Sequence, residues 1–135
     1  MRTRLTVAVA SLAGLLITAV PVVAHHSFAA EYDANKPITL TGTVTKVEWT
    51  NPHCWFYIDA KNGASGKTEN WALELGNPNQ LLRAGWTRHS LKIGDVITVE
   101  GSRARDGSLM VNARSMILMS TGQRLFAGSS QGTNP

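Results

Sequence analysis

The sequence predicts an all-β domain, a small barrel of five or six strands with one short helix between strands 3 and 4. Three observations lead to this prediction. Runs of β-forming residues alternate apolar and polar side chains, as strands with one buried face do. Short turns rich in Gly, Asn and Asp separate these runs. The one stretch with helix start and stop signals follows the third run.

The first strand is predicted over residues 38–49 and is long for a small domain. Its apolar side chains alternate up to Val44, but Val47 falls on the opposite phase. One extra residue near positions 45–46 would restore the alternation, which is what a β-bulge does. An internal Gly42 together with a bulge indicates a strand that bends around a barrel.

Strands 2 and 3 are predicted over residues 53–59 and 68–75, joined by a hairpin loop. The apolar face of this pair should point into the core and consists of Cys54, Phe56, Ile58, Trp71, Leu73 and Leu75. The opposite face should point outward and carries His53, Trp55, Tyr57, Asp59, Asn70, Ala72 and Glu74. We expect Cys54 to act as a small apolar core residue.

A short helix is predicted over residues 76–85, with Asn77 as its cap, Pro78 at its first position and Gly85 at its exit. Two further strands, 96–101 and 108–119, flank an Asp-Gly turn. Residues 123–126 can add an edge strand. A long bent first strand, hairpins and a helix only between strands 3 and 4 together indicate an OB-fold-like barrel over residues 38–127. A β-sandwich is the alternative, but it usually has more strands and no helix.

The two ends of the chain should lie outside the barrel. Residues 1–24 have the basic start, apolar run and small-residue site of a secretory signal peptide, with cleavage expected after Ala24. An uncleaved anchor is the alternative. Residues 25–37 should pack on the barrel, and residues 128–135 should be disordered. We therefore expect a periplasmic or secreted protein with no membrane anchor after cleavage.

Composition limits the possible partners. The full chain has a net charge of +4, and removal of Arg2 and Arg4 leaves 11 basic against nine acidic residues, a net charge of +2. The basic residues are scattered, so no nucleic-acid partner is expected. Cys54 is the only cysteine in the sequence, which excludes an internal disulfide.

Several short motifs resemble an uncharacterised family of small secreted bacterial proteins, a domain of unknown function. After cleavage these proteins begin with His-His-Ser-Phe, which is residues 25–28 here. The other shared motifs are Gly-Thr-Val at 42–44, Trp-x-Asn-Pro-His at 49–53, Trp-x-Leu-Glu at 71–74 and the Gly-Asp to Gly run at 94–101. The resemblance implies export and an OB-like barrel. It implies no activity and no catalytic residues.

Histidines are the residues most suggestive of a site. Cleavage after Ala24 would make His25 the amino terminus, where an amine beside an imidazole chelates a metal, and His26 adds a second imidazole. Nitrogen ligands of this kind suit copper or another transition metal. His53 should face Glu74 across strands 2 and 3, which makes Glu74 a second ligand or a partner of the imidazole. The sequence therefore predicts a metal site of His25, His26 and His53.

Two alternatives remain open. His53 could simply fix the turn after Asn-Pro, with His25 and His26 in a polar tail. The outward Trp55 and Tyr57 could instead bind a glycan or a partner protein, unless the leading segment covers them.

His89 should be an ordinary loop residue. No catalytic triad, phosphate loop or carboxylate pair stands out in the sequence, so an enzyme is not expected.

Overall fold

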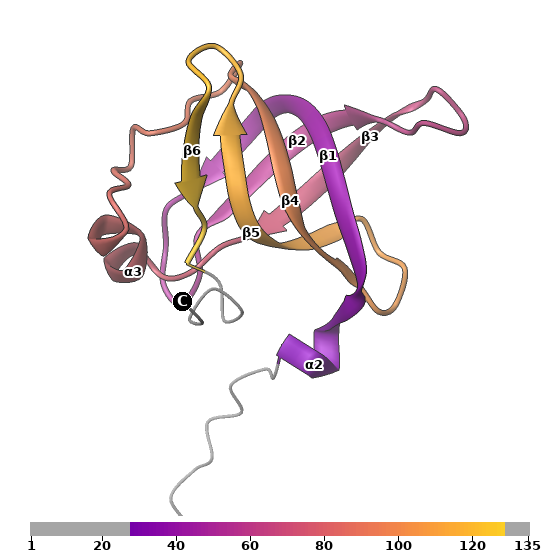
Figure 1. Cartoon of the computed structure of the whole chain (residues 1–135), viewed down its shortest axis with the longest axis horizontal. Coiled ribbons are helices and arrows are strands. Elements are labelled where there is room, and N and C mark those ends of the chain that lie inside the picture. Colours follow the sequence, from indigo (N-terminus) through magenta and orange to yellow (C-terminus); the bar gives the residue numbers. More distant parts are fainter. Residues whose placement is uncertain (1–27, 129–135) are drawn as a thin grey trace, which may run out of the picture.

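The computed structural model describes residues 28–128. The predicted signal peptide, residues 1–24, lies outside this range, as does the predicted tail apart from Gly128. In chain order the elements are α2 (Phe28–Glu31), β1 (Tyr32–Glu48), β2 (Trp55–Lys61), β3 (Thr68–Glu74), α3 (Pro78–Arg83), β4 (Val96–Ala104), β5 (Met110–Leu118) and β6 (Gln123–Phe126). Figure 1 shows the strands wrapped into one barrel, with the short helices α2 and α3 outside it.

The strands form a closed ring. The sheet order is β3-β2-β1-β4-β5-β6, and a further pairing between β3 and β5 joins the two sides of the sheet. That closing pair is parallel and covers Ala72 to Glu74 against Met110 to Asn112, whereas all other neighbours are antiparallel. With α3 between β3 and β4, this is the OB-fold-like barrel predicted from the sequence. β6 pairs with β5 alone, outside the closing pair.

The bend in β1 is built as predicted. The pairing of β1 with β2 shifts register between Val44 and Lys46, which is the expected bulge. Gly42 lies where β1 passes close to β2, because a Cβ at this position would be 2.5 Å from the carbonyl oxygen of Asp59. One long strand thereby serves both halves of the barrel, pairing with β2 at one end and β4 at the other.

The barrel interior is apolar. All six residues predicted for the inward face of β2 and β3 are buried, and they join side chains of β4, β5 and α3 in one core. Trp86, after α3, is 1% exposed and donates its ring N–H to the carbonyl oxygen of Phe126 at 2.8 Å. This contact ties the helix side of the barrel to β6, and Figure 1 shows α3 on that side.

Helix α3 has the predicted caps. The Asn77 side chain accepts from the Gln80 backbone N–H, and the Gln80 side chain accepts from the Asn77 N–H, which makes a complete capping box. Gly85 has the predicted left-handed conformation, with φ 91°. Of the helix, Leu81 is buried in the core.

The start of β1 differs from the prediction. The strand begins at Tyr32, six residues before Ile38, because Tyr32 pairs with Ala104 at the far end of β4. Residues 33–36 have no alternation and interrupt the register between Tyr32 and Pro37. The sequence pattern does not predict strand structure in residues 32–37, because this part of β1 forms by pairing with the distant strand β4.

Candidate functional site

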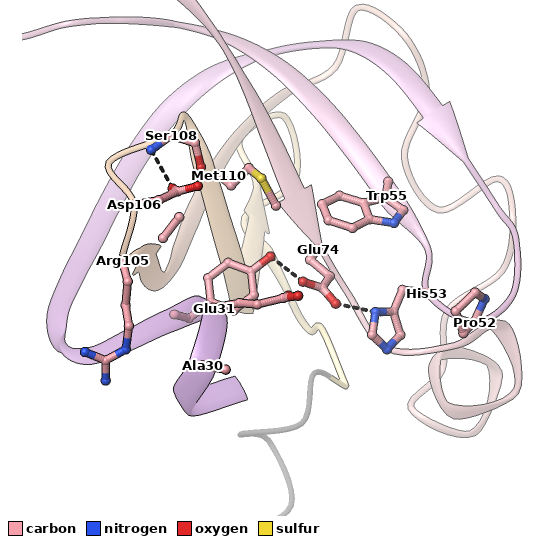
Figure 2. Close-up of a pocket in the computed structure, with 12 residues that line it drawn as sticks. Ala30, Glu31, Pro52, His53, Trp55, Glu74, Arg105, Asp106, Ser108 and Met110 are labelled. Atoms are coloured by element: carbon pink, nitrogen blue, oxygen red, sulfur yellow. Dashed lines mark hydrogen bonds and ion pairs between the residues drawn. The ribbon is translucent and has the colours of Figure 1, made fainter. Parts of the chain in front are cut away.

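An open cleft of about 550 Å³ lies outside the barrel, over the starts of β2 and β5 and the end of β3. The β1–β2 loop borders it on one side, and α2 and the β4–β5 loop border it on the other. Figure 2 shows its lining, which consists of Ala30, Glu31, Tyr32, Pro52, His53, Trp55, Glu74, Ala104, Arg105, Asp106, Ser108 and Met110. In OB-folds the strand 2–3 face and these two loops are the usual ligand-binding surface.

His53 and Glu74 meet at this cleft. Trp55 pairs with Glu74 across β2 and β3, and the backbone bonds between Cys54 and Leu75 and between Cys54 and Gly76 continue the pairing toward His53. The Nδ1 atom of His53 contacts one carboxylate oxygen of Glu74. The two side chains that the alternation pattern placed on one face are therefore in contact.

Glu74 is more buried than its place on the outward face suggests. Glu74 lies on the outward face of β3, but its side chain is only 7% exposed, against 44% for His53. Tyr32, from the early start of β1, is itself 1% exposed and hydrogen-bonds to the carboxylate. The outward face is therefore covered at this point by the amino-terminal part of the domain.

Tyr32 contacts the other oxygen of Glu74. Its hydroxyl donates to Oε2, while Oε1 faces His53. Tyr32 is 1% exposed, and burial together with the Glu74 carboxylate raises the pKa of its hydroxyl far above the usual range. The ring of Phe28 stacks on that of Tyr32, with centroids 5.7 Å apart. Because its pKa is raised, the Tyr32 hydroxyl stays a donor at any ordinary pH.

Arg105 anchors α2 against the β4–β5 loop. Its Nε donates to the carbonyl oxygen of Ala29 at 2.7 Å, and its backbone N–H donates to the carbonyl oxygen of Glu31 at 2.8 Å. A guanidinium nitrogen lies 3.8 Å from the Asp33 carboxylate. These contacts hold the segment that carries Tyr32 at the edge of the cleft.

The two predicted aromatic residues lie differently. Trp55 is half-buried and forms a wall of the cleft. Tyr57, also half-buried, does not line it, since its hydroxyl donates to Glu48 at 3.0 Å and Lys46 Nζ lies 5.0 Å from its ring centroid. Tyr32 contacts Glu74, the residue that pairs with Trp55, and Trp55 itself stays half-buried.

Of the other predicted residues, Cys54 and His89 do not line the cleft. His25 and His26 lie outside residues 28–128. Cys54 is fully buried in the core, where desolvation raises the pKa of its thiol, and His89 is exposed in the loop after α3. Among residues 28–128, no group of three or more His, Cys, Asp or Glu side chains is arranged to hold a metal ion.

Sequence reasoning missed three residues of this site. It expected residues 25–37 to pack on the barrel but did not predict the bond between Tyr32 and Glu74, and it did not connect Arg105 or Met110 with His53. All three reach the cleft through the β1–β4 pairing and the β3–β5 closure, which join segments far apart in the chain. No local spacing signals those contacts.

Comparison with known proteins identifies a family without assigning an activity. A family model described as "Family of unknown function (DUF6152)" matches residues 12–112, which confirms the resemblance to an uncharacterised family. No curated protein matches the chain. Across residues 28–128, no helix is long and apolar enough to cross a membrane.

Solved structures with a similar strand arrangement include two crystal structures of Rim1, a mitochondrial single-stranded DNA binding protein from S. cerevisiae. The first has a TM-score of 0.48 and 14% identity, and the second has 0.46 and 15%. Each match covers 62% of this chain and 93% of that protein. A similarity of this size says nothing of what the present chain binds.

Proposed function

Since the chain belongs to the DUF6152 family of unknown function, its role has to be argued from its site, and we propose that it is an exported protein that binds a transition metal ion, with copper as the first candidate. The proposed ligands are His53 and, from the mature amino terminus, His25 and His26. The observation that carries the proposal is the contact between Nδ1 of His53 and the buried carboxylate of Glu74.

This contact favours the ligand form of the imidazole. A neutral imidazole has one N–H and one lone pair, and a carboxylate facing Nδ1 favours the proton on that nitrogen. The lone pair then lies on Nε2, which points away from Glu74 in Figure 2. Metal-binding histidines commonly have a carboxylate behind the ring in this way.

The charge around the cleft also favours a cation. Three acidic residues line it, namely Glu31, Glu74 and Asp106, against one basic residue, Arg105. The Arg105 guanidinium is already directed to the Ala29 carbonyl and the Asp33 carboxylate. Negative potential concentrated in a cleft attracts a positively charged ligand.

Chain length allows the predicted amino terminus to approach the cleft. His26 precedes Phe28 by two residues, and two extended residues span about 7 Å. Phe28 stacks on Tyr32, whose hydroxyl contacts the same carboxylate as His53. A mature chain starting at His25 would offer an amine and two imidazoles near this point.

The test is calorimetric titration with Cu(II) of a chain that begins at His25. We expect His53→Ala to weaken the affinity on the order of tenfold or more, because one imidazole ligand is lost. His89→Ala is the matched control, since His89 is exposed in a loop away from the cleft. Equal affinity in wild type and His53→Ala would contradict the proposal.

Export and the free amino terminus are tested separately. The intact mass of protein purified from the periplasm should correspond to a chain of residues 25–135. Adding two residues before His25 should weaken Cu(II) binding, because the terminal amine moves away from the His25 imidazole. Unchanged binding in the extended chain would remove the terminal amine from the ligand set.

A second candidate function rests on Trp55. Its half-buried ring forms a wall of a cleft whose volume is in the range of small-molecule sites. A sugar or a partner side chain could stack there without any metal. Saccharide binding that is lost in Trp55→Ala and kept in His53→Ala would favour this function over the metal site.

A further inference from the structure

We infer that Tyr32 and Glu74 are positioning residues that hold the imidazole of His53 with its proton on Nδ1 and its Nε2 free for a ligand. The amino-terminal segment of the domain, residues 28–33, would then be part of the binding site. The metal-binding consequence of this inference rests on the proposed function, whereas the effect on His53 itself does not.

The first step is that both oxygens of Glu74 have a partner. Tyr32 Oη donates to Oε2, and Nδ1 of His53 contacts Oε1. The carboxyl group can therefore not turn without losing one of these contacts. Its orientation toward the imidazole depends on the Tyr32 hydroxyl.

The second step is that Glu74 is too deeply buried to be held by solvent instead. Its side chain is 7% exposed, and Tyr32 beside it is 1% exposed. A buried carboxylate that loses a hydrogen-bond donor is left with an unfavourable desolvated charge. Without the Tyr32 hydroxyl, the side chain of Glu74 should shift toward water and release His53.

The third step is that Tyr32 reaches Glu74 only when the amino-terminal segment is docked. The two residues are 42 positions apart in the sequence. Phe28 stacks on the Tyr32 ring, and Arg105 binds the carbonyl oxygens of Ala29 and Glu31. Docking of this segment is therefore coupled to the state of the His53 ring.

The experiment compares Tyr32→Phe with Tyr57→Phe. Each variant removes one hydroxyl that donates to a glutamate on the outer face of the barrel, but Tyr57 donates to Glu48 and not to Glu74. Nitrogen-15 NMR of the metal-free protein at about pH 8 reports which ring nitrogen carries the proton. We expect His53 to have its proton on Nδ1 in wild type and Tyr57→Phe, and a mixture in Tyr32→Phe.

Cu(II) titration of the same variants gives the second measurement. We expect Tyr32→Phe to weaken binding about tenfold and Tyr57→Phe to leave it unchanged, because only the first alters the support of His53. Urea unfolding of both variants identifies a general loss of stability. An altered ring proton in Tyr32→Phe without Cu(II) binding in any variant would refute the proposed function and support the positioning role.

Glu74→Gln provides an independent variant in case Tyr32→Phe folds poorly. Gln has the shape of Glu but is neutral, so it should favour the Nδ1 proton less than the carboxylate does. We expect a larger fraction of Nε2–H imidazole at His53 in Glu74→Gln. A His53 ring whose proton remains on Nδ1 in both Tyr32→Phe and Glu74→Gln would overturn the inference.

Discussion

Gly42 marks the point where two backbones come closest in the bent part of β1. A Cβ placed there would lie 2.5 Å from the carbonyl oxygen of Asp59 and 3.1 Å from the Cβ of Ala60. The first of these atoms belongs to backbone in the paired strand β2, which cannot move as a flexible side chain would. The smallest side chain therefore already exceeds the available space.

We predict that Gly42→Ala destabilises the protein by about 1–3 kcal/mol, the usual effect of forcing an extra methyl group into a packed site. The free energy of unfolding in urea measures it. Gly63→Ala is the matched control, because no atom lies within 4 Å of its added Cβ. Equal stability of the two variants would show that β1 and β2 can separate easily at this point.

Local alternation predicts part of the site at this scale. It places His53 and Glu74 on one face of neighbouring strands, and the two side chains are in contact. It does not reveal that Glu74 is buried, because Tyr32 covers it from a position 42 residues earlier. Contacts between neighbouring strands can be predicted from the alternation of apolar and polar residues. Contacts made by docking of a distant segment cannot be predicted in this way.

At the scale of elements, Arg105 anchors α2 to the β4–β5 loop. The helix has four residues and none of them is buried, so it has little packing energy of its own. Arg105 supplies a side-chain bond to Ala29 and a backbone bond to Glu31. The amino-terminal segment should therefore open more readily than the strands of the barrel.

We predict that Arg105→Ala speeds hydrogen exchange of the amides in residues 28–33 about tenfold. A charge-assisted bond contributes about 1.5–3 kcal/mol, and the half-exposed position of Arg105 keeps its contribution at the lower end of that range. Amides of β4 report whether the barrel is affected. Arg88→Ala, in an exposed loop, is the control. Unchanged exchange in residues 28–33 would mean that other contacts hold the segment.

The elements differ in how well the sequence predicts them. The bulge in β1, both caps of α3 and the bounds of β6 agree with the predictions because each has a local signal. The early start of β1 has none, since residues 33–36 are polar or small and their conformation follows from pairing with β4. Local chemistry thus accounts for turns, caps and bulges, and tertiary pairing accounts for how far a strand extends.

For the molecule as a whole, Cys54 is a natural reporter of unfolding. Its side chain is fully buried in the single core, and desolvation raises the pKa of its thiol, so the reactive thiolate is scarce at neutral pH. Only an opened barrel should expose it.

We predict that a thiol reagent modifies the native protein at neutral pH far more slowly than the urea-unfolded protein. The urea dependence of the labelling rate should follow the global unfolding transition measured by tryptophan fluorescence. Glutathione under the same conditions controls for the effect of urea on the reagent. Fast labelling without urea would indicate that the core opens locally around residue 54.

The parallel seam between β3 and β5 has a wider consequence. It joins three residue pairs, and Glu74 belongs to the last of them, opposite Asn112. Because this pairing is so short, we expect the barrel to open first between β3 and β5 when it unfolds locally. A ligand that binds His53 and thereby stabilises the position of Glu74 would also stabilise this strand pairing. Occupancy of the cleft should therefore raise resistance to heat and to proteases by mass action.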